Sequence, residues 1–140
     1  MRVIHFTEAA TDPLKGFGSF AASFLPLADG QGDTHLSCLH LEIGGKIQAP
    51  SISHSAALLC IHGCLSVKTP IPETQINLHA GMGAVFSPNE PYTLKSDIGA
   101  ILLIVESQEL TAHSRAISTP QRIAGATWPG DTLWMHAAKK

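Results

Sequence analysis

The sequence predicts a single compact all-β domain, built as an antiparallel sandwich or barrel. Its 140 residues fall in the size range of one domain, and 44% of them are hydrophobic against 14% charged, a balance typical of a packed core rather than a disordered chain. The apolar runs are short, and glycine, proline or aspartate separates most of them from the next. Because little helical periodicity accompanies them, about eight short strands at this spacing favour a sandwich or barrel.

The first third of the chain contains three expected strands. Residues 2–6 and 19–27 are strand-like, and Pro26 marks an edge or an end, because proline cannot donate a backbone hydrogen bond. Residues 29–33 form a loop, since glycine and aspartate supply the backbone angles that turns require. Residues 35–42 alternate loosely before two glycines, which predicts the third strand.

The central part of the chain contains the remaining expected strands. Ala56–Ile61 is almost wholly apolar and predicts a buried strand, and His62-Gly63 turns the chain into the next one. Prolines and glycines then punctuate the sequence. Between these breaks we expect strands at residues 64–68, 75–79, 84–86, 92–95 and 101–106. The barrel core is thus predicted to span about residues 19–106 of a single domain, 1–140.

Residues 107–140 form a tail of a different character. Glu109–Ala116 is compatible with a helical turn or two, and Thr119-Pro120 resembles a helix start with proline in the first position. We expect Trp128 and Trp134 to pack on the barrel or on a partner subunit, because large aromatic side chains gain most from burial.

Charge and hydropathy set aside several classes of partner. The formal net charge is −2, and Lys139-Lys140 is the one basic block, so we expect neither nucleic acid nor an anionic membrane as partner. The longest apolar runs, such as Ala100–Val105, are too short to span a bilayer. No signal-peptide pattern begins the sequence, and three cysteines make no disulfide framework. We therefore expect a cytoplasmic protein.

Two glycine turns and a proline turn follow one another in the central half of the chain. The first is Gly63, between residues 58–62 and 64–67, and the second spans residues 80–83 and leads through Pro88 to Tyr92. The order of these turns, from Gly45 onward, resembles the two motifs of the cupin family. The resemblance implies an antiparallel double-stranded β-helix, the jelly-roll barrel of cupins.

The metal-binding residues of the cupin motifs have no counterparts here. Cupins carry two histidines one residue apart, then a glutamate, and later a last histidine. Counted back from Gly63, the paired histidines fall on Pro50 and Ile52 and the glutamate on Ala56, while the last histidine falls on Tyr92. Proline, isoleucine and alanine side chains cannot ligate a divalent ion, and a neutral tyrosine is a poor ligand. The resemblance therefore implies a cupin without a metal or other cofactor.

Strand alternation predicts which side chains face the interior, if the lost ligand positions do so. Successive side chains of a strand point to opposite faces, which gives six inward residues: His54, Leu58, Cys60, His62, Tyr92 and Leu94. A mostly apolar pocket with a few polar tips is typical of a small-molecule site. The leading hypothesis is a metal-independent cupin that binds a small, partly apolar molecule, with no catalysis required.

A second hypothesis makes the chain an enzyme. A histidine titrates near neutral pH and a phenol can donate or hold a proton, so His54 and Tyr92 could serve as base and acid. The arrangement is similar to that of metal-free cupin epimerases and isomerases, which implies an isomerase, epimerase or cyclase.

Two further possibilities stay open. Cys60-x-His62-x-Cys64 combines zinc-ligand types, although a bend at Gly63 would separate Cys64 from the others, and a buried cysteine is more often a small hydrophobic residue. The chain could also be a regulatory or protein-interaction module whose partner covers the tail. His35 and His40 are interpreted as ordinary surface or cavity residues.

For each of these functions we expect a homodimer. Cupin barrels commonly pair through an apolar sheet face, and an exposed sheet edge gains from being covered.

Overall fold

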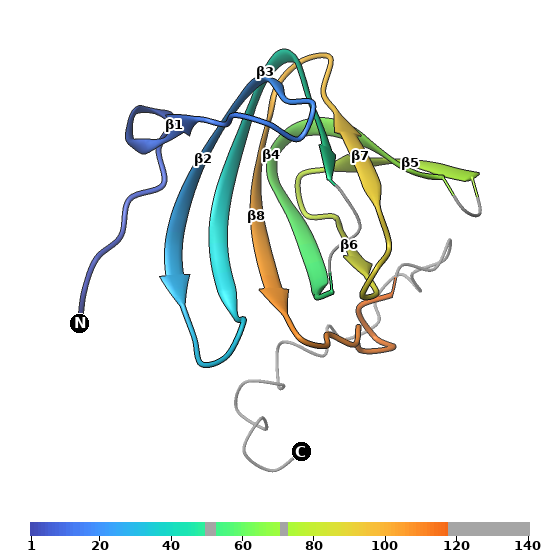
Figure 1. Ribbon diagram of the computed structural model, residues 1–140. Coiled ribbons are helices and arrows are strands. Elements are labelled where there is room, and N and C mark those ends of the chain that lie inside the picture. Colours follow the sequence, from blue (N-terminus) through green and yellow to red (C-terminus); the bar gives the residue numbers. More distant parts are fainter. Residues whose placement is uncertain (50–52, 71–72, 118–140) are drawn as a thin grey trace, which may run out of the picture. The chain divides into compact units, whose positions relative to one another are not determined.

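The computed structural model describes residues 1–49, 53–70 and 73–117 (Figure 1). The fold is all-β, as predicted, and its strands lie within the compact unit Met1–Leu110, while Thr111–Lys140 forms a second unit. The elements are η1 (Glu8–Ala10), β1 (Asp12–Pro13), β2 (Phe20–Asp29), β3 (His35–Ala49), β4 (Ser55–Pro70), β5 (Glu73–His79), β6 (Gly83–Phe86), β7 (Tyr92–Lys95) and β8 (Ala100–Ser107).

Four strands pair in a closed ring that makes the barrel. The first half of β3 pairs with β8, which pairs with the first half of β4; the second half of β4 pairs with β7, which returns to the second half of β3. All of these pairings are antiparallel. The long strands β3 and β4 therefore bend over one end of the barrel and belong to both of its sheets (Figure 1).

The other strands extend the two sheets beyond this ring. β2 pairs with β3, and the short β1 pairs with β2. β6 pairs with the first half of β4, whereas β5 pairs with its second half. Because the two halves of β4 lie in different sheets, β5 and β6 are edge strands of opposite sheets.

A buried serine, Ser96, forms hydrogen bonds with the bends of β3 and β4 at the closed end of the barrel. The Ser96 hydroxyl donates to the Cys64 carbonyl oxygen at 2.6 Å and accepts from the Gly99 backbone N–H at 2.9 Å. The Ser96 backbone exchanges hydrogen bonds with Gly44 and Gly45 at 2.8 and 2.9 Å. One residue thus links the bends of β3 and β4 to the turn between β7 and β8.

The interior of the barrel is filled by apolar side chains. Alternate residues of β8 face inward, and the same holds for the neighbouring stretches of β3 and β4, as the period of two requires. The largest fully buried apolar side chains are Leu39, Leu58, Leu65, Leu78, Leu94 and Leu102. This leucine core occupies the space in which the sequence predicts a ligand.

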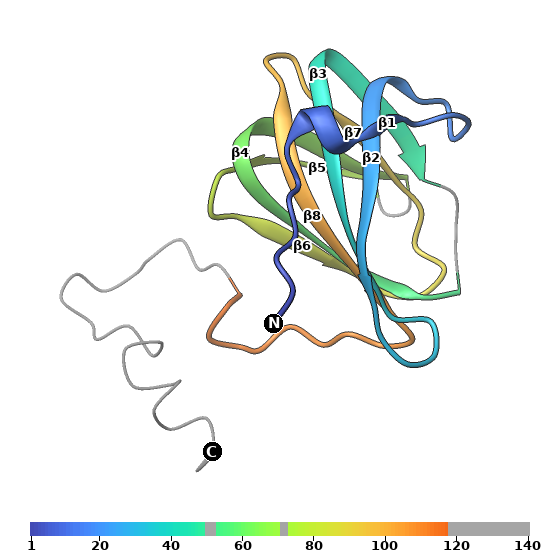
Figure 2. The ribbon, with the colours of Figure 1, turned by 90° about the vertical axis from the view of Figure 1, so that its left-hand side faces the viewer.

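Several local predictions are wrong. The strand expected at 35–42 does not stop at Gly44-Gly45 but continues as β3 to Ala49. Residues 2–6 form no strand; they extend over the outer face of β3, where the Phe6 carbonyl oxygen accepts from His40 Nε2 at 3.0 Å (Figure 2). The strands expected at 56–61 and 64–68 are one strand, because Gly63 bends β4 without ending it. The helical turns expected at 109–116 reduce to one hydrogen-bonded turn from His113. Thr119 onward lies outside the described residues.

Within the described part of the chain, no helix is long and apolar enough to cross a membrane.

Candidate functional site

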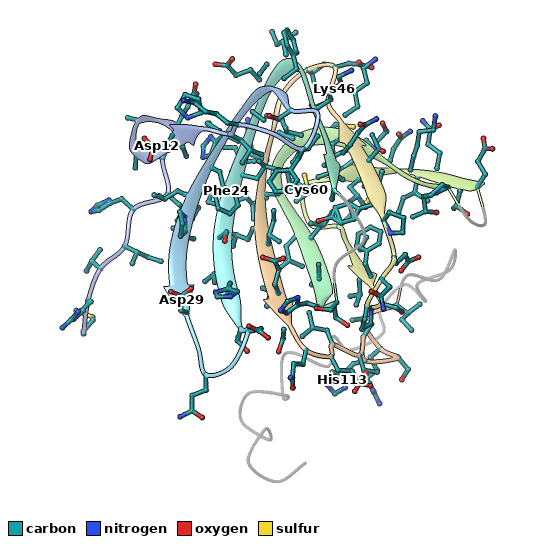
Figure 3. All side chains as sticks on the ribbon, in the orientation of Figure 1. Asp12, Phe24, Asp29, Lys46, Cys60 and His113 are labelled. Atoms are coloured by element: carbon teal, nitrogen blue, oxygen red, sulfur yellow. The ribbon has the colours of Figure 1, made fainter. Side chains whose placement is uncertain are left out.

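Polar side chains gather at the end of the barrel opposite the bends, which we call the mouth. The register places His35 of β3 and Ala56 of β4 on either side of Glu106 of β8, near the ends of these strands. Asp29 ends β2 at the same level (Figure 3). Here the hydrogen-bonded sheets end, so side chains can meet solvent and ligands.

Tyr92 begins β7 and shares the inward face of that strand with Leu94. Its ring stacks on Phe86 at the end of β6, with ring centroids 4.3 Å apart and an interplanar angle of 27°. Burial, with a smaller contribution from the Glu106 carboxylate, raises the pKa of the Tyr92 phenol to about 12. At neutral pH Tyr92 is therefore a protonated hydrogen-bond donor.

A cavity of about 600 Å³ opens beside Tyr92, and we call it the Tyr92 cavity. It lies between the end of β3, the start of β7 and the β4–β5 hairpin. Its lining consists of Gln48, Ala49, Lys68, Thr69, Pro70, Glu73, Pro91, Tyr92 and Thr93. Six of the nine lining residues have polar side chains, including one cation and one anion, while the alanine and the two prolines supply apolar surface.

Three of the residues predicted to bind a ligand belong to the packed core. Leu58 and Leu94 have no exposed surface, and Cys60 is 2% exposed. All three pack in the apolar cluster that fills the barrel. The Cys60 thiol donates weakly to the carbonyl oxygens of His62 and Gly63, at 3.5 and 3.7 Å. Burial raises the pKa of this thiol, which disfavours the thiolate.

The inward orientation expected for His62 is wrong. The register of β4 against β8 shifts between Cys60 and His62: Cys60 opposes the inward Leu102, whereas His62 opposes the outward Ile101. Such a β-bulge inserts one residue, and a shift of one residue moves the following side chains to the other face. His62 consequently lies exposed on the outside of the barrel.

His54 lies at the rim of the mouth. Its Nε2 is 3.3 Å from an Asp33 carboxylate oxygen, and its Nδ1 is 3.4 Å from the Ser53 hydroxyl. These contacts direct the imidazole toward the loop between β2 and β3. His54 is not among the residues that line the Tyr92 cavity, so the described contacts do not bring it together with Tyr92.

Two polar residues at the mouth, Glu106 and His35, were missed as site candidates. The sequence signal for Glu106 is its parity, because it continues the inward series Leu102, Ile104. His35 Nδ1 is 2.7 Å from an Asp29 carboxylate oxygen, and this hydrogen bond is the main cause that raises the pKa of His35. Glu106 lies directly opposite Ala56 on the neighbouring strand, and Ala56 is the residue on which counting back from Gly63 places the cupin glutamate.

The histidines and cysteines of the described residues lie apart. No group of three or more His, Cys, Asp or Glu side chains within this part of the chain could hold a metal ion. In the Cys60-x-His62-x-Cys64 series, the bulge turns His62 away from Cys60. Two of the four positions that correspond to cupin metal ligands, Pro50 and Ile52, lie outside the described residues.

Comparisons with known proteins locate the fold. No protein-family model matches the sequence, and no curated protein matches it. Among solved structures, the polyketide cyclase RemF from Streptomyces resistomycificus is similar with a TM-score of 0.68 and 15% identity, over 78% of this chain and 80% of that one. An RmlC-like cupin from Shewanella frigidimarina has a TM-score of 0.63 and 15% identity, over 78% and 93%.

The Schizosaccharomyces pombe Cnp3 cupin domain is similar at a TM-score of 0.61 and 12% identity, over 77% of this chain and 76% of that one. Identities this low carry information about the fold alone. Together with the closed ring of β3, β8, β4 and β7, these likenesses show that this chain has the cupin fold.

Proposed function

We propose that the protein binds a small, partly apolar molecule in the Tyr92 cavity. The observation that carries the proposal is a cavity of about 600 Å³ whose lining includes the partly buried Tyr92. Small-molecule sites typically measure about 300–1,000 Å³ and combine apolar walls with a few polar groups. The proposed site lies at the mouth and not in the barrel interior, where the sequence predicts it, because leucine side chains fill the interior.

The polar groups of the cavity favour an uncharged, hydrogen-bonding head group. Tyr92 is a neutral donor at physiological pH, since the pKa of its phenol is about 12. Gln48 lies on the outward face of β3, opposite Thr93, and its amide supplies both a donor and an acceptor from that side of the cavity. Lys68 and Glu73 carry opposite charges on the same lining, so neither sign of ligand charge is selected. An amide or alcohol bearing an apolar group satisfies these conditions.

Binding is proposed to require no metal. The resemblance to the cupin motifs aligns Ala56 with the glutamate ligand and Tyr92 with the last histidine. Ala56 is 2% exposed and cannot ligate, and a protonated phenol is a poor ligand.

Benzamide is a suitable probe, and we expect it to bind with a dissociation constant in the millimolar range. Gln48→Ala and Tyr92→Phe should each weaken binding by about 2- to 10-fold, the equivalent of one lost hydrogen bond. Gln75→Ala is the matched control, because Gln75 is exposed beside Lys68 but does not line the cavity. Ligand-observed NMR and calorimetry give the affinities.

Two controls accompany this experiment. Tyr92 is the only tyrosine of the chain, so the phenolate absorbance of Gln48→Ala, still rising near pH 12, would show that the cavity is intact. Dialysis against a chelator should leave benzamide affinity unchanged. Equal affinity in all variants would exclude the Tyr92 cavity as the site, and a loss of affinity after chelation would refute metal independence.

An isomerase that uses His54 and Tyr92 receives less support. RemF, the cyclase among the similar structures, shares the fold at 15% identity, which does not carry a reaction to this chain. His54 contacts Asp33 at the rim of the mouth, away from the lining of the Tyr92 cavity. Binding without catalysis needs only groups that the cavity already contains.

A second copy of the chain is the proposed partner on the outer face of β4 and β6. Leu59, Ile61, Met82 and Val85 are each 40–43% exposed. Leu59 and Val85 lie in the paired stretches of β4 and β6, and the Met82 carbonyl oxygen, just before β6, accepts from the Cys60 backbone N–H at 2.9 Å. Such clusters of exposed apolar side chains mark interaction surfaces. Sedimentation at micromolar concentration should show a dimer that Val85→Lys converts to monomer; a wild-type monomer would contradict the pairing.

A further inference from the structure

A second cavity, of about 230 Å³, lies between the edge strands β5 and β6. These strands belong to opposite sheets, and within the described residues each of them pairs with β4 alone. The sheets therefore part between them. Val67 and Ile76 line the cavity from one sheet, while Ala84 and Phe86 line it from the other. We call it the Phe86 cavity.

The walls of this cavity are mainly apolar, although Glu90 contributes to its rim. The Glu90 carboxylate accepts a hydrogen bond from the Ser87 backbone N–H at 2.9 Å. That bond holds the charge against the loop between β6 and β7. The four inward side chains of the two sheets leave a space suited to hydrocarbon rather than to a charged group.

The two cavities are neighbours with a common wall. Thr69 lines both of them. The stacked ring pair stands between them, because Tyr92 lines the larger cavity and Phe86 lines the smaller one, with centroids 4.3 Å apart. The consecutive residues Glu90 and Pro91 are divided between them in the same way. Thr69 and the ring pair therefore form the boundary that a molecule in both cavities would cross.

We propose that the Phe86 cavity receives the apolar part of the molecule whose polar head lies in the Tyr92 cavity. The inference rests on the proposed function and narrows its ligand to an amphiphile with an uncharged, hydrogen-bonding head and a short hydrocarbon chain or ring. The cavity has room for about eight groups the size of a water molecule, at roughly 30 Å³ each. A chain of medium length would fill it.

A homologous series of unbranched amides, from propanamide to octanamide, tests this assignment. Burial of one methylene group contributes about 0.8 kcal/mol, so affinity should rise about fourfold per methylene until the cavity is full. Calorimetry on the full-length wild-type protein measures the increment. An affinity independent of chain length, with propanamide still bound and still sensitive to Gln48→Ala, would overturn the apolar subsite and leave the proposed function standing.

Ala84→Leu should remove the chain-length dependence, because the larger side chain fills the Phe86 cavity. Ala57→Leu is the matched control: Ala57 lies on β4 beside β6, directly opposite Val85, and is not among the residues that line the Phe86 cavity. Propanamide affinity should stay unchanged in both variants, while octanamide affinity should fall at least tenfold in Ala84→Leu only. An equal loss in both would also overturn the subsite. Failure of every amide to bind the wild type would refute the proposed function itself.

Discussion

Gly63→Ala is expected to destabilise the protein by on the order of 4 kcal/mol, a large part of the roughly 5–15 kcal/mol that stabilises a natural domain. Gly63 has a φ of +81°, a conformation that side chains with a Cβ adopt at a cost. A Cβ there would lie 2.1 Å from the Gly99 carbonyl oxygen and 2.9 Å from Ala100 Cα. Both atoms are backbone at the start of β8, so no side-chain rotation relieves the clash.

Gly81→Ala separates the cost of the left-handed backbone conformation from the cost of the steric clash. Gly81 also has a positive φ, +93°, but a Cβ there would meet nothing within 4 Å. Its substitution costs only the left-handed conformation, about 1–2 kcal/mol. Urea unfolding of both variants gives the difference, which measures the close approach of β4 to β8. If Gly63→Ala lowered the free energy of unfolding no more than Gly81→Ala, the bend of β4 would have room for a Cβ atom, which would contradict the close approach.

The strands of the second half of the barrel could be predicted well from the sequence. β7 was predicted at residues 92–95, as observed, and β6 and β8 were predicted to within one residue at each end. Turn residues bracket these strands on both sides, and short apolar stretches lie between the turns. Residues 2–6 have comparable local character but no strand to pair with, because β3 already lies between β2 and β8. The sequence of a segment alone does not determine whether a strand is available to pair with it.

The candidate site was harder to predict, for two physical reasons. A period-two pattern fixes the face of a side chain only while the register is constant, and the bulge after Cys60 reversed it for His62. The pattern also does not distinguish a cavity from a packed core: Leu58 and Leu94 face inward as predicted, but they touch other leucines. The cavity lining at Gln48 and Thr93 arises where strands end, and no sequence motif marks such a place.

Leu58→Ala is expected to cost about 2–5 kcal/mol of unfolding free energy and to leave benzamide affinity of the folded protein unchanged. Leu58 has no exposed surface. It lies in the sheet that contains the first half of β4, between Ala84 of β6 and Ile104 of β8. Truncation removes buried apolar surface and leaves a cavity that the two neighbouring strands prevent from collapsing. Thermal and urea unfolding measure the loss.

Leu59→Ala is the matched control, one residue along the same strand. Its side chain points outward and is 42% exposed, but it belongs to the proposed dimer face. Both truncations are therefore compared in the Val85→Lys background, where the protein should be monomeric and Leu59→Ala should cost less than about 1 kcal/mol. The comparison decides between the two roles considered for Leu58. A residue that lines a ligand site would lose affinity and little stability, whereas a core residue loses stability alone. Similar stability in the two variants, with weaker benzamide binding in Leu58→Ala, would indicate that the ligand site lies in the barrel interior.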